Sequence, residues 1–439
     1  MSGTLKLGAT GGQILFSTSG TSGLATPATG YGSLYYGTDS QLRLKDDAGT
    51  ITILGAGGGT GSGFTTGGGS LTSNLAGSLD GSALVANTTG AFNLAIGASA
   101  AAANTIGAGN VAIGYQAFQK NTTGDTCTAV GYQALKENRN EGNTAVGSSA
   151  LELNTYGRYN TGLGDHALST STTVSYNTAV GAYALNANTT GEKSTAVGSD
   201  ALQANTTGSY NTAVGFESLK ANTIGDSNTA IGYAASYQST TAEDNVVVGW
   251  LAGSGLTGGS RNVAVGHDAG ALNNYTDSVF IGQRAGRDNE ANFTVAVGKS
   301  ALEGANTGAA NTAIGYQSLQ VNTTGAASTA VGYQTLKANT TGANNTAIGY
   351  GSLTANITGS NNLALGYQAG QTITIGSNNI ILGATGGTAG MASTFAYYND
   401  ANNNLTINSG AIVTATITDS NRHIPIVIGG TTYKLLLST

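Results

Sequence analysis

A fifteen-residue phrase, Asn211-Thr-Ala-Val-Gly-Phe-Glu-Ser-Leu-Lys-Ala-Asn-Thr-Ile-Gly225, sets the architecture of this 439-residue chain, because variants of it recur along most of its length. The fifth residue of the phrase, which we call the anchor glycine, returns at intervals of 17 or, three times, 16 residues. A short fixed period of this kind is typical of a solenoid in which each repeat forms one coil. The 18 anchor glycines are Gly97, Gly114, Gly131, Gly147, Gly164, Gly181, Gly198, Gly215, Gly232, Gly249, Gly266, Gly282, Gly298, Gly315, Gly332, Gly349, Gly366 and Gly383.

Aligning the repeats as columns predicts which side chains face inward. The residue before the anchor glycine is always Val, Ile or Leu, and the residue three places before it is either aliphatic or Thr. Since side chains two apart on a strand share a face, we expect both columns to point into the coil. The small residue between them, usually Ala, would then face outward, where a column of small side chains suggests that another chain approaches closely. Its representatives are Ala129, Ala213 and Ala347.

The second half of each repeat predicts a second strand and a return turn. Leu usually lies four residues after the anchor glycine, as Leu219 does, and would supply the opposing inner wall. Asn-Thr-Thr-Gly and its variants would form the return turn, where Asn and Gly tolerate positive φ. Asn also opens most coils, which predicts a ladder of stacked amides along the axis.

The flanks do not follow the period. Residues 41–45 and 50–54 alternate about an Asp-Asp-Ala-Gly turn and predict a hairpin, and residues 423–437 predict another about Gly429-Gly430. Residues 13–16 and 33–36 resemble short strands, residues 396–398 and 405–407 suggest one more hairpin, and residues 79–84 suggest a degenerate first coil. The predicted organisation is an N-terminal β region (1–56), a glycine-rich hinge and lead-in (57–92), a solenoid shaft (93–387) and a C-terminal β region (388–439).

Composition limits the classes of function. The net charge of −6 is spread thinly, only 9% of residues are charged, and no basic run occurs, which argues against nucleic-acid binding. No apolar run approaches the ~20 residues of a membrane-spanning helix, so membrane insertion is not expected. No signal peptide is visible at the N-terminus. The single cysteine, Cys127, occupies the Asn column and reads as a small neutral substitute. No cofactor is expected.

Several columns contain residues that could carry chemistry. Asp200 and Glu217 fall in one column of adjacent coils, at a spacing near that of the carboxylates of retaining glycosidases, but two solvated carboxylates are the simpler interpretation. Asp268 and Arg284 share this column and predict an ion pair. The histidines show no metal-ligand spacing within one chain, although three copies of His423 could meet on an axis of three chains.

Two regular arrays suggest surface binding. The residue after the anchor glycine is often aromatic, which predicts a stacked ladder more than a row that grips sugars. Regular Thr arrays suit ice, but the strand Thr column (Thr128, Thr144, Thr178, Thr212, Thr346) is expected to point inward, which leaves only the turn column outside (Thr122, Thr189, Thr206, Thr323, Thr340). Ice binding is therefore weakly supported. The aromatic column consists of Tyr115, Tyr132, Phe216, Tyr233, Trp250, Tyr316, Tyr333, Tyr350 and Tyr367.

The phrase Asn-Thr-Ala-Val-Gly resembles the head repeats of trimeric autotransporter adhesins, with a longer period, over residues 93–387. That resemblance implies a left-handed parallel β-roll in a homotrimer, with the Ala column as candidate trimer contact. The ends resemble bacteriophage tail fibres, with residues 32–50 similar to N-terminal fibre segments and residues 424–433 similar to the C-termini of marine phage fibres.

Together these resemblances imply a non-enzymatic structural fibre of a virion, a tail or head fibre made in the host cytoplasm. Its N-terminal region would bind other virion proteins, and the fibre would reach a glycan or protein of the host surface. Two alternatives remain open: a bacterial surface adhesin of the trimeric type, and a tailspike-like enzyme that cleaves polysaccharide.

Overall fold

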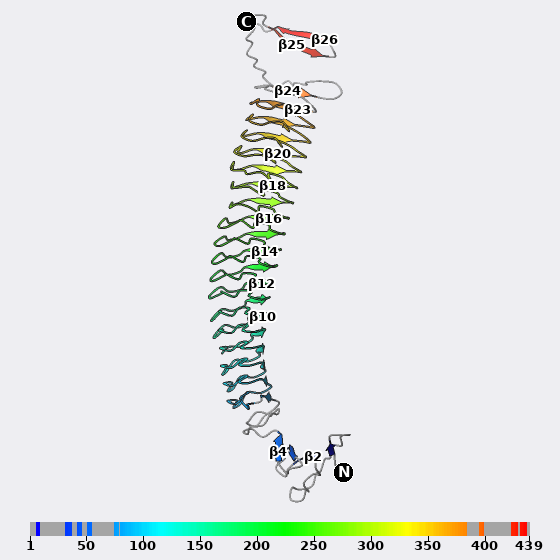
Figure 1. Ribbon diagram of the computed structural model, residues 1–439. Coiled ribbons are helices and arrows are strands. Elements are labelled where there is room, and N and C mark those ends of the chain that lie inside the picture. Colours follow the sequence, from blue (N-terminus) through cyan, green and yellow to red (C-terminus); the bar gives the residue numbers. More distant parts are fainter. Residues whose placement is uncertain are drawn as a thin grey trace. The chain divides into compact units, whose positions relative to one another are not determined.

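The computed structural model describes residues 74–78 and 80–383 in full and, outside them, seven short strands as backbone. The described part of the chain is all β, with no helix in it. It divides into two compact units, Met1–Gly259 and Ser260–Thr439, each of which contains a parallel stack of one-strand coils (Figure 1). The predicted β-solenoid, with a period of about 17 residues, is confirmed.

In the first unit, every strand of the stack pairs in parallel with the next, and equivalent residues face each other. Thr195, for example, pairs with Thr212, which pairs with Thr229. A shift of one whole repeat therefore reproduces the same environment. The strands are β5 (Leu75–Gly77), β6 (Leu94–Ile96), β7 (Val111–Ile113), β8 (Thr128–Val130), β9 (Thr144–Val146), β10 (Thr161–Leu163), β11 (Thr178–Val180), β12 (Thr195–Val197), β13 (Thr212–Val214), β14 (Thr229–Ile231) and β15 (Val246–Val248).

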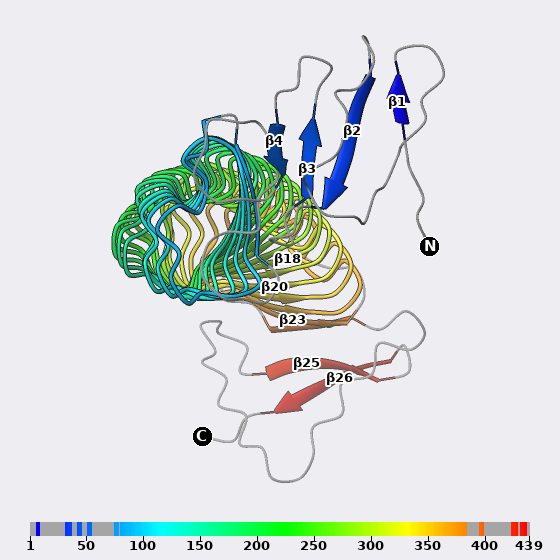
Figure 2. The same ribbon diagram turned by 90° about the horizontal axis from the view of Figure 1, so that it is seen from below.

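The second unit repeats this arrangement, and Figure 2 shows β18 and β20 along the same side of its coils. Its strands are β16 (Val263–Val265), β17 (Val279–Ile281), β18 (Val295–Val297), β19 (Thr312–Ile314), β20 (Thr329–Val331), β21 (Thr346–Ile348), β22 (Leu363–Leu365), β23 (Ile380–Gly383) and β24 (Phe395–Tyr398).

Antiparallel strands accompany each stack. In the first unit β1 (Lys6–Gly8), β2 (Tyr31–Tyr36), β3 (Leu42–Lys45) and β4 (Ile51–Leu54) form a four-stranded sheet in chain order. In the second unit β25 (His423–Ile428) pairs with β26 (Thr431–Leu436). The hairpins predicted at 41–54 and 423–437 are confirmed.

The parallel pairing extends beyond the period seen in the sequence. β5 pairs with β6, so a first coil begins before residue 79, where the degenerate coil was predicted to start. β24 continues the parallel stack beyond β23. The hairpin predicted for residues 396–407 stays a prediction, because its second strand lies outside the described residues. Residues 13–16, 55–70 and 405–407 lie outside the described residues.

The strand faces are inverted relative to the sequence prediction. The central Ala of each strand is buried, as Ala213 is at 0% exposure, whereas the residues on either side are half-buried or exposed. The Val/Ile and Thr columns therefore face outward. The reason is the width of the coil: the Leu side chain of the opposite wall, such as Leu219 at 0% exposure, fills the centre and leaves room only for a methyl group.

The opposite wall is not a second strand. Leu219 and the residue two before it, Glu217, both have left-handed backbones, with φ of 50° and 56°. This conformation is uncommon for side chains other than glycine, and it repeats from coil to coil. The chain therefore curls instead of extending, yet Leu219 still points inward and its N–H donates to the carbonyl of Ala235 in the next coil (3.0 Å).

Two amide ladders run through the interior, of which the sequence predicted one. In the predicted ladder, Asn228 donates its backbone N–H to the side-chain oxygen of Asn211 (2.9 Å). The second ladder is formed by the Asn of the turn: the Asn222 side-chain nitrogen donates to the side-chain oxygen of Asn205 (2.8 Å). Both ladders also donate to the turn carbonyl of Gly225 (2.8 and 3.0 Å). The buried amide nitrogens of these residues are thereby paired, as a narrow core requires, whereas the side-chain oxygens of Asn154, Asn222 and Asn356 have no hydrogen-bond partner among the described residues.

Glycine is needed at two positions for different reasons. The anchor Gly215 has φ of +134°, and an added Cβ would also lie 2.3 Å from the carbonyl oxygen of Gly232 in the next coil. The turn Gly208 has no left-handed φ; its Cβ would instead meet the side-chain oxygen of Asn205 and the carbonyl of Gly225, both at 2.5 Å. The turn Asn and Gly thus serve close packing against the ladder, not the positive φ expected from the sequence.

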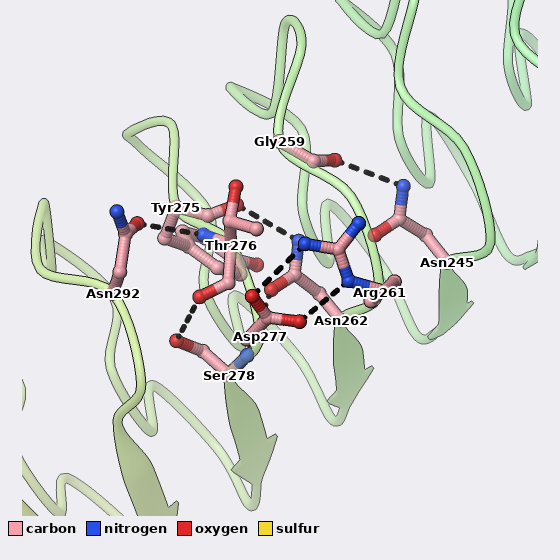
Figure 3. A network of polar contacts seen from close by, with 9 residues as sticks. All are labelled: Asn245, Gly259, Arg261, Asn262, Tyr275, Thr276, Asp277, Ser278 and Asn292. Carbon is pink, nitrogen blue, oxygen red and sulfur yellow. Dashed lines mark hydrogen bonds and ion pairs between the residues drawn. The ribbon is translucent and has the colours of Figure 1, made fainter. Parts of the chain in front are cut away.

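Larger side chains enter the Ala column only where the Leu column loses its side chain. In the second unit Phe280 replaces Ala and is fully buried, and Gly270 and Gly286 replace Leu. A Cβ on Gly286 would lie 2.3 Å from the Phe280 ring. Tyr275 packs edge-on against Phe280 (4.7 Å between centroids), and its backbone carbonyl accepts a hydrogen bond from the ladder residue Asn262 (Figure 3).

Candidate functional surfaces

The most extensive surface feature is the outer side of the strands, which we call the strand face. It consists of the residues one and three places before each anchor glycine, and all of them are Val, Ile, Leu or Thr. Many of its side chains are two-fifths exposed, including Val146, Ile231 and, in the second unit, Ile348. An uncharged and largely apolar surface that continues from strand to strand is a candidate interaction site.

The Ala side chains proposed as trimer contacts do not lie on this surface. Ala129, Ala213 and Ala347 are each 0% exposed inside their own coil. The prediction that this column faces outward is wrong, because the strand alternates in the opposite sense. Contact between chains on this side would be made by the neighbouring Thr and Val columns.

The turn Thr column lies outside, as predicted, with Thr122 and Thr189 exposed, whereas the prediction that the strand Thr column points inward is wrong. The turn hydroxyls are bound: Thr206 Oγ1 donates to the carbonyl of Thr223 (2.9 Å), and the pattern repeats in most coils. The strand Thr residues face outward, in register from Thr128 to Thr229, and their hydroxyls have no hydrogen-bond partner among the described residues. The argument against an outward Thr array therefore no longer holds.

The residues after the anchor glycines form exposed aromatic runs. In the second unit four tyrosines stack in sequence from Tyr316 to Tyr367, with centroids 4.8–5.4 Å apart. In the first unit Tyr115 stacks on Tyr132, and Phe216 on Tyr233, which meets Trp250 edge-on. Because each ring covers the face of its neighbour, few ring faces remain free to stack on a sugar.

A second aromatic column, which sequence reasoning missed, precedes the strands. It contains Tyr159 and Tyr176, which stack at 5.6 Å, and Tyr210, over whose ring the Lys193 ammonium lies at 5.1 Å. These residues lie five before the anchor glycine and have left-handed backbones. Tabulating that position over all repeats would have revealed the column.

The paired carboxylates are held by a cation. The Lys220 ammonium lies 2.6 Å from the Glu217 carboxylate and 3.5 Å from that of Asp200. Its hydrogen bond to Glu217 raises the pKa of Lys220. Both carboxylates are therefore ion-paired with Lys220. The ion pair predicted between Arg284 and Asp268 is present at 4.0 Å.

The histidines have neighbours of other kinds. His166 stacks on Tyr183 at 5.3 Å and lies 3.0 Å from Asp165, and His267 lies 3.2 Å from Asp268. No group of three or more His, Cys, Asp or Glu suited to a metal ion occurs within residues 74–78 and 80–383. The side chain of His423 is not among those described.

Cys127 is buried inside its coil. Its backbone N–H donates to the side-chain oxygen of Asn110 (2.8 Å), and its Sγ lies 3.2 Å from the carbonyl of Asn140. Burial raises the pKa of its thiol to about 11. At neutral pH the group is a protonated thiol in an amide column, which is a poor nucleophile.

Comparison with family models, with curated proteins and with solved structures finds no match for this chain. Among the described residues, no helix has the length and apolar character needed to cross a membrane.

Proposed function

We propose that the chain is a non-enzymatic structural fibre whose solenoid is a shaft, and that three copies associate through the strand face. The observation that carries this proposal is the uncharged apolar strand face, which continues through each stack. In a single chain, several Val and Ile side chains of this face remain about two-fifths exposed to water. Burying them between chains would add hydrophobic stabilisation.

The resemblance of the ends to phage fibres extends the proposal to a virion fibre. Its N-terminal part attaches to the particle and its shaft holds the C-terminal part near a host-surface glycan or protein. Labelling each terminus in electron micrographs of particles tests this: one terminus should meet the virion and the other should lie distal. Label only on bacterial surfaces would instead support the adhesin alternative.

The enzyme alternative is less well supported, because Lys220 binds both carboxylates that suggested it. Incubation with host capsule or lipopolysaccharide should leave the glycan chains at their original length. Shortened chains would contradict the non-enzymatic proposal.

The trimer is tested by light scattering on the full chain. We expect about three times the 43.4 kDa of one chain. The double variant Val197→Glu, Val214→Glu places charges on adjacent coils of the strand face and should reduce the mass to one chain while circular dichroism stays unchanged. The matched control, Thr190→Glu with Thr207→Glu, places charges on two exposed turn residues and should stay trimeric. A single-chain mass for the unmodified protein would contradict the proposal.

A second candidate is favoured by one observation, the outward Thr hydroxyls that have no partner among the described residues. In-register rows of hydroxyl and methyl groups could order water as an ice surface does. A monomeric protein that halts ice growth, and loses this activity in Val197→Glu, Val214→Glu, would support this candidate over the trimer.

A further inference from the structure

The strand face is bordered by two columns whose residues vary in size from coil to coil. The entry column lies five residues before each anchor glycine and contains Tyr159 and Tyr176, which are about half exposed. The exit column lies directly after the anchor glycine and contains Tyr233 and Trp250, also about half exposed. Both borders are thus accessible in a single chain.

Within one coil the two columns are complementary in size. The coil of Gly181 has Tyr176 at entry and Ala182 at exit, whereas the coil of Gly232 has Ser227 at entry and Tyr233 at exit. Of the ten coils with anchor glycines from 97 to 249, seven have one aromatic residue in the pair. In the second unit five of the eight coils have one aromatic residue in the pair, as in Ala327 with Tyr333.

Three coils of the first unit depart from this relation: the coil of Gly147 has no aromatic residue, with Gly142 and Ser148, and the other two compensate each other. The coil of Gly215 has an aromatic residue in both columns, Tyr210 and Phe216, but the preceding coil has none, with Lys193 and Ser199. These two coils together therefore have two aromatic side chains in the entry and exit columns, the same number as two coils with one each.

Packing within one chain does not require this relation. Entry and exit residues of one coil lie at opposite ends of a three-residue strand, and in the coil with an aromatic residue in both columns the described ring contacts of Tyr210 and Phe216 are with other residues. The ring contacts within each column run from coil to coil, as between Tyr159 and Tyr176. The size relation therefore points to a neighbour outside the chain.

We propose that the chains of the trimer meet edge to edge and in register, with the entry column of one chain packed beside the exit column of the next. This inference rests on the proposed homotrimer. A threefold axis parallel to the stack places equivalent coils at the same height. Three identical contacts, each between the entry column of one chain and the exit column of the next, then close the ring. At the height of most coils a bulky side chain from one chain then lies beside a small one from its neighbour, which keeps the separation of the chains nearly constant.

The available area is adequate for such an interface. The ten strands β6–β15 at ~4.8 Å each and a width of at most about 20 Å from entry to exit outline up to roughly 960 Å² per chain, against about 800 Å² per partner in a standard stable interface. The aromatic borders also supply the residue types that are enriched in interface cores.

Cross-linking between singly substituted chains tests the pairing. Lys193→Cys and Ser199→Cys place one thiol at entry and one at exit of the same coil, and both positions are accessible. The native Cys127 is buried and stays unmodified. Chains with each substitution are refolded together and treated with a short bismaleimide, and the doubly substituted chain under denaturing conditions controls for cross-linking within one chain. We expect covalent dimers from the mixture, none from either variant alone, and covalent trimers from the doubly substituted chain.

The control pairs Lys193→Cys with Ser148→Cys, an exit residue three coils away and thus offset by ~14 Å along the axis. It should give no covalent dimer. A trimeric mass without cross-links in the matched mixture would overturn the edge pairing and leave the trimer standing. Equal yields in matched and offset mixtures would overturn the register, and a single-chain mass would overturn both trimer and pairing.

Discussion

Phe280, in the Ala column, and Gly286, in the Leu column, test quantitatively whether the side chains of these two columns share the interior of the coil. Phe280→Ala removes a fully buried ring and should destabilise the second unit by about 3–5 kcal/mol, the usual range for a large cavity. Gly286→Leu alone should also destabilise it, by about 1–3 kcal/mol or more, because its Cβ would lie 2.3 Å from the Phe280 ring.

The double variant is the informative one. Phe280→Ala with Gly286→Leu recreates the pairing of ordinary coils, such as Ala296 with Leu302, and position 286 already has the left-handed φ of that Leu column (57° against 49°). We therefore expect the double variant to lose less free energy than Phe280→Ala alone, with a coupling of several kcal/mol between the two sites.

Urea unfolding followed by circular dichroism, at one protein concentration, measures the four corners of this cycle. As a control, Phe280→Ala is combined with Gln317→Leu, a partly exposed left-handed position in another coil, where the effects should add. Additive losses for Phe280 and Gly286 would show that the two side chains do not share one space, and the account of the narrow core would fail.

Three further predictions concern the amide ladder, its buried thiol and the repeat period. Cys127→Asn should stabilise the protein by about 0.5–1.5 kcal/mol, because an amide there can donate to the carbonyl of Asn140 as its column neighbours do. In the native protein, burial raises the pKa of the Cys127 thiol from 9.0 to about 11, so the unfolded chain loses this proton first. The free energy of unfolding should then fall by about 2–3 kcal/mol from pH 9 to pH 11, and a Cys127→Ser control that falls equally would disprove the assignment. Deleting Ser199–Gly215, one full repeat, should shorten the imaged shaft by one strand spacing (~4.8 Å) with little change in melting temperature, whereas deleting Ser199–Thr207 should unfold neighbouring coils. Equal melting temperatures for the two deletions would contradict one coil per repeat.

The sequence predicts the coils, the strand positions, two hairpins and one amide ladder, because each depends on period or turn chemistry. It does not decide which strand face is inside, because Ala on one face and Val on the other are both apolar, and larger aliphatics are more often the buried set. Two signals in the sequence favour the correct face. Thr212 and its equivalents would need buried partners if they faced inward, and Phe280 enters the Ala column where Leu gives way to Gly286.

The inversion also changes the argument about assembly. A coil whose interior holds Ala213, Leu219 and two ladder amides buries little apolar area, so each repeat gains modest stability from its own core. The larger aliphatic side chains, such as Val214, lie outside, where they stabilise the fold only if another surface covers them. A sequence that maintained Val, Ile or Leu at that outer position in all 18 repeats for the monomer alone would expose apolar area without benefit. The narrow core and the apolar exterior therefore support the same proposal, in which the chain reaches its full stability when the strand faces of several copies meet.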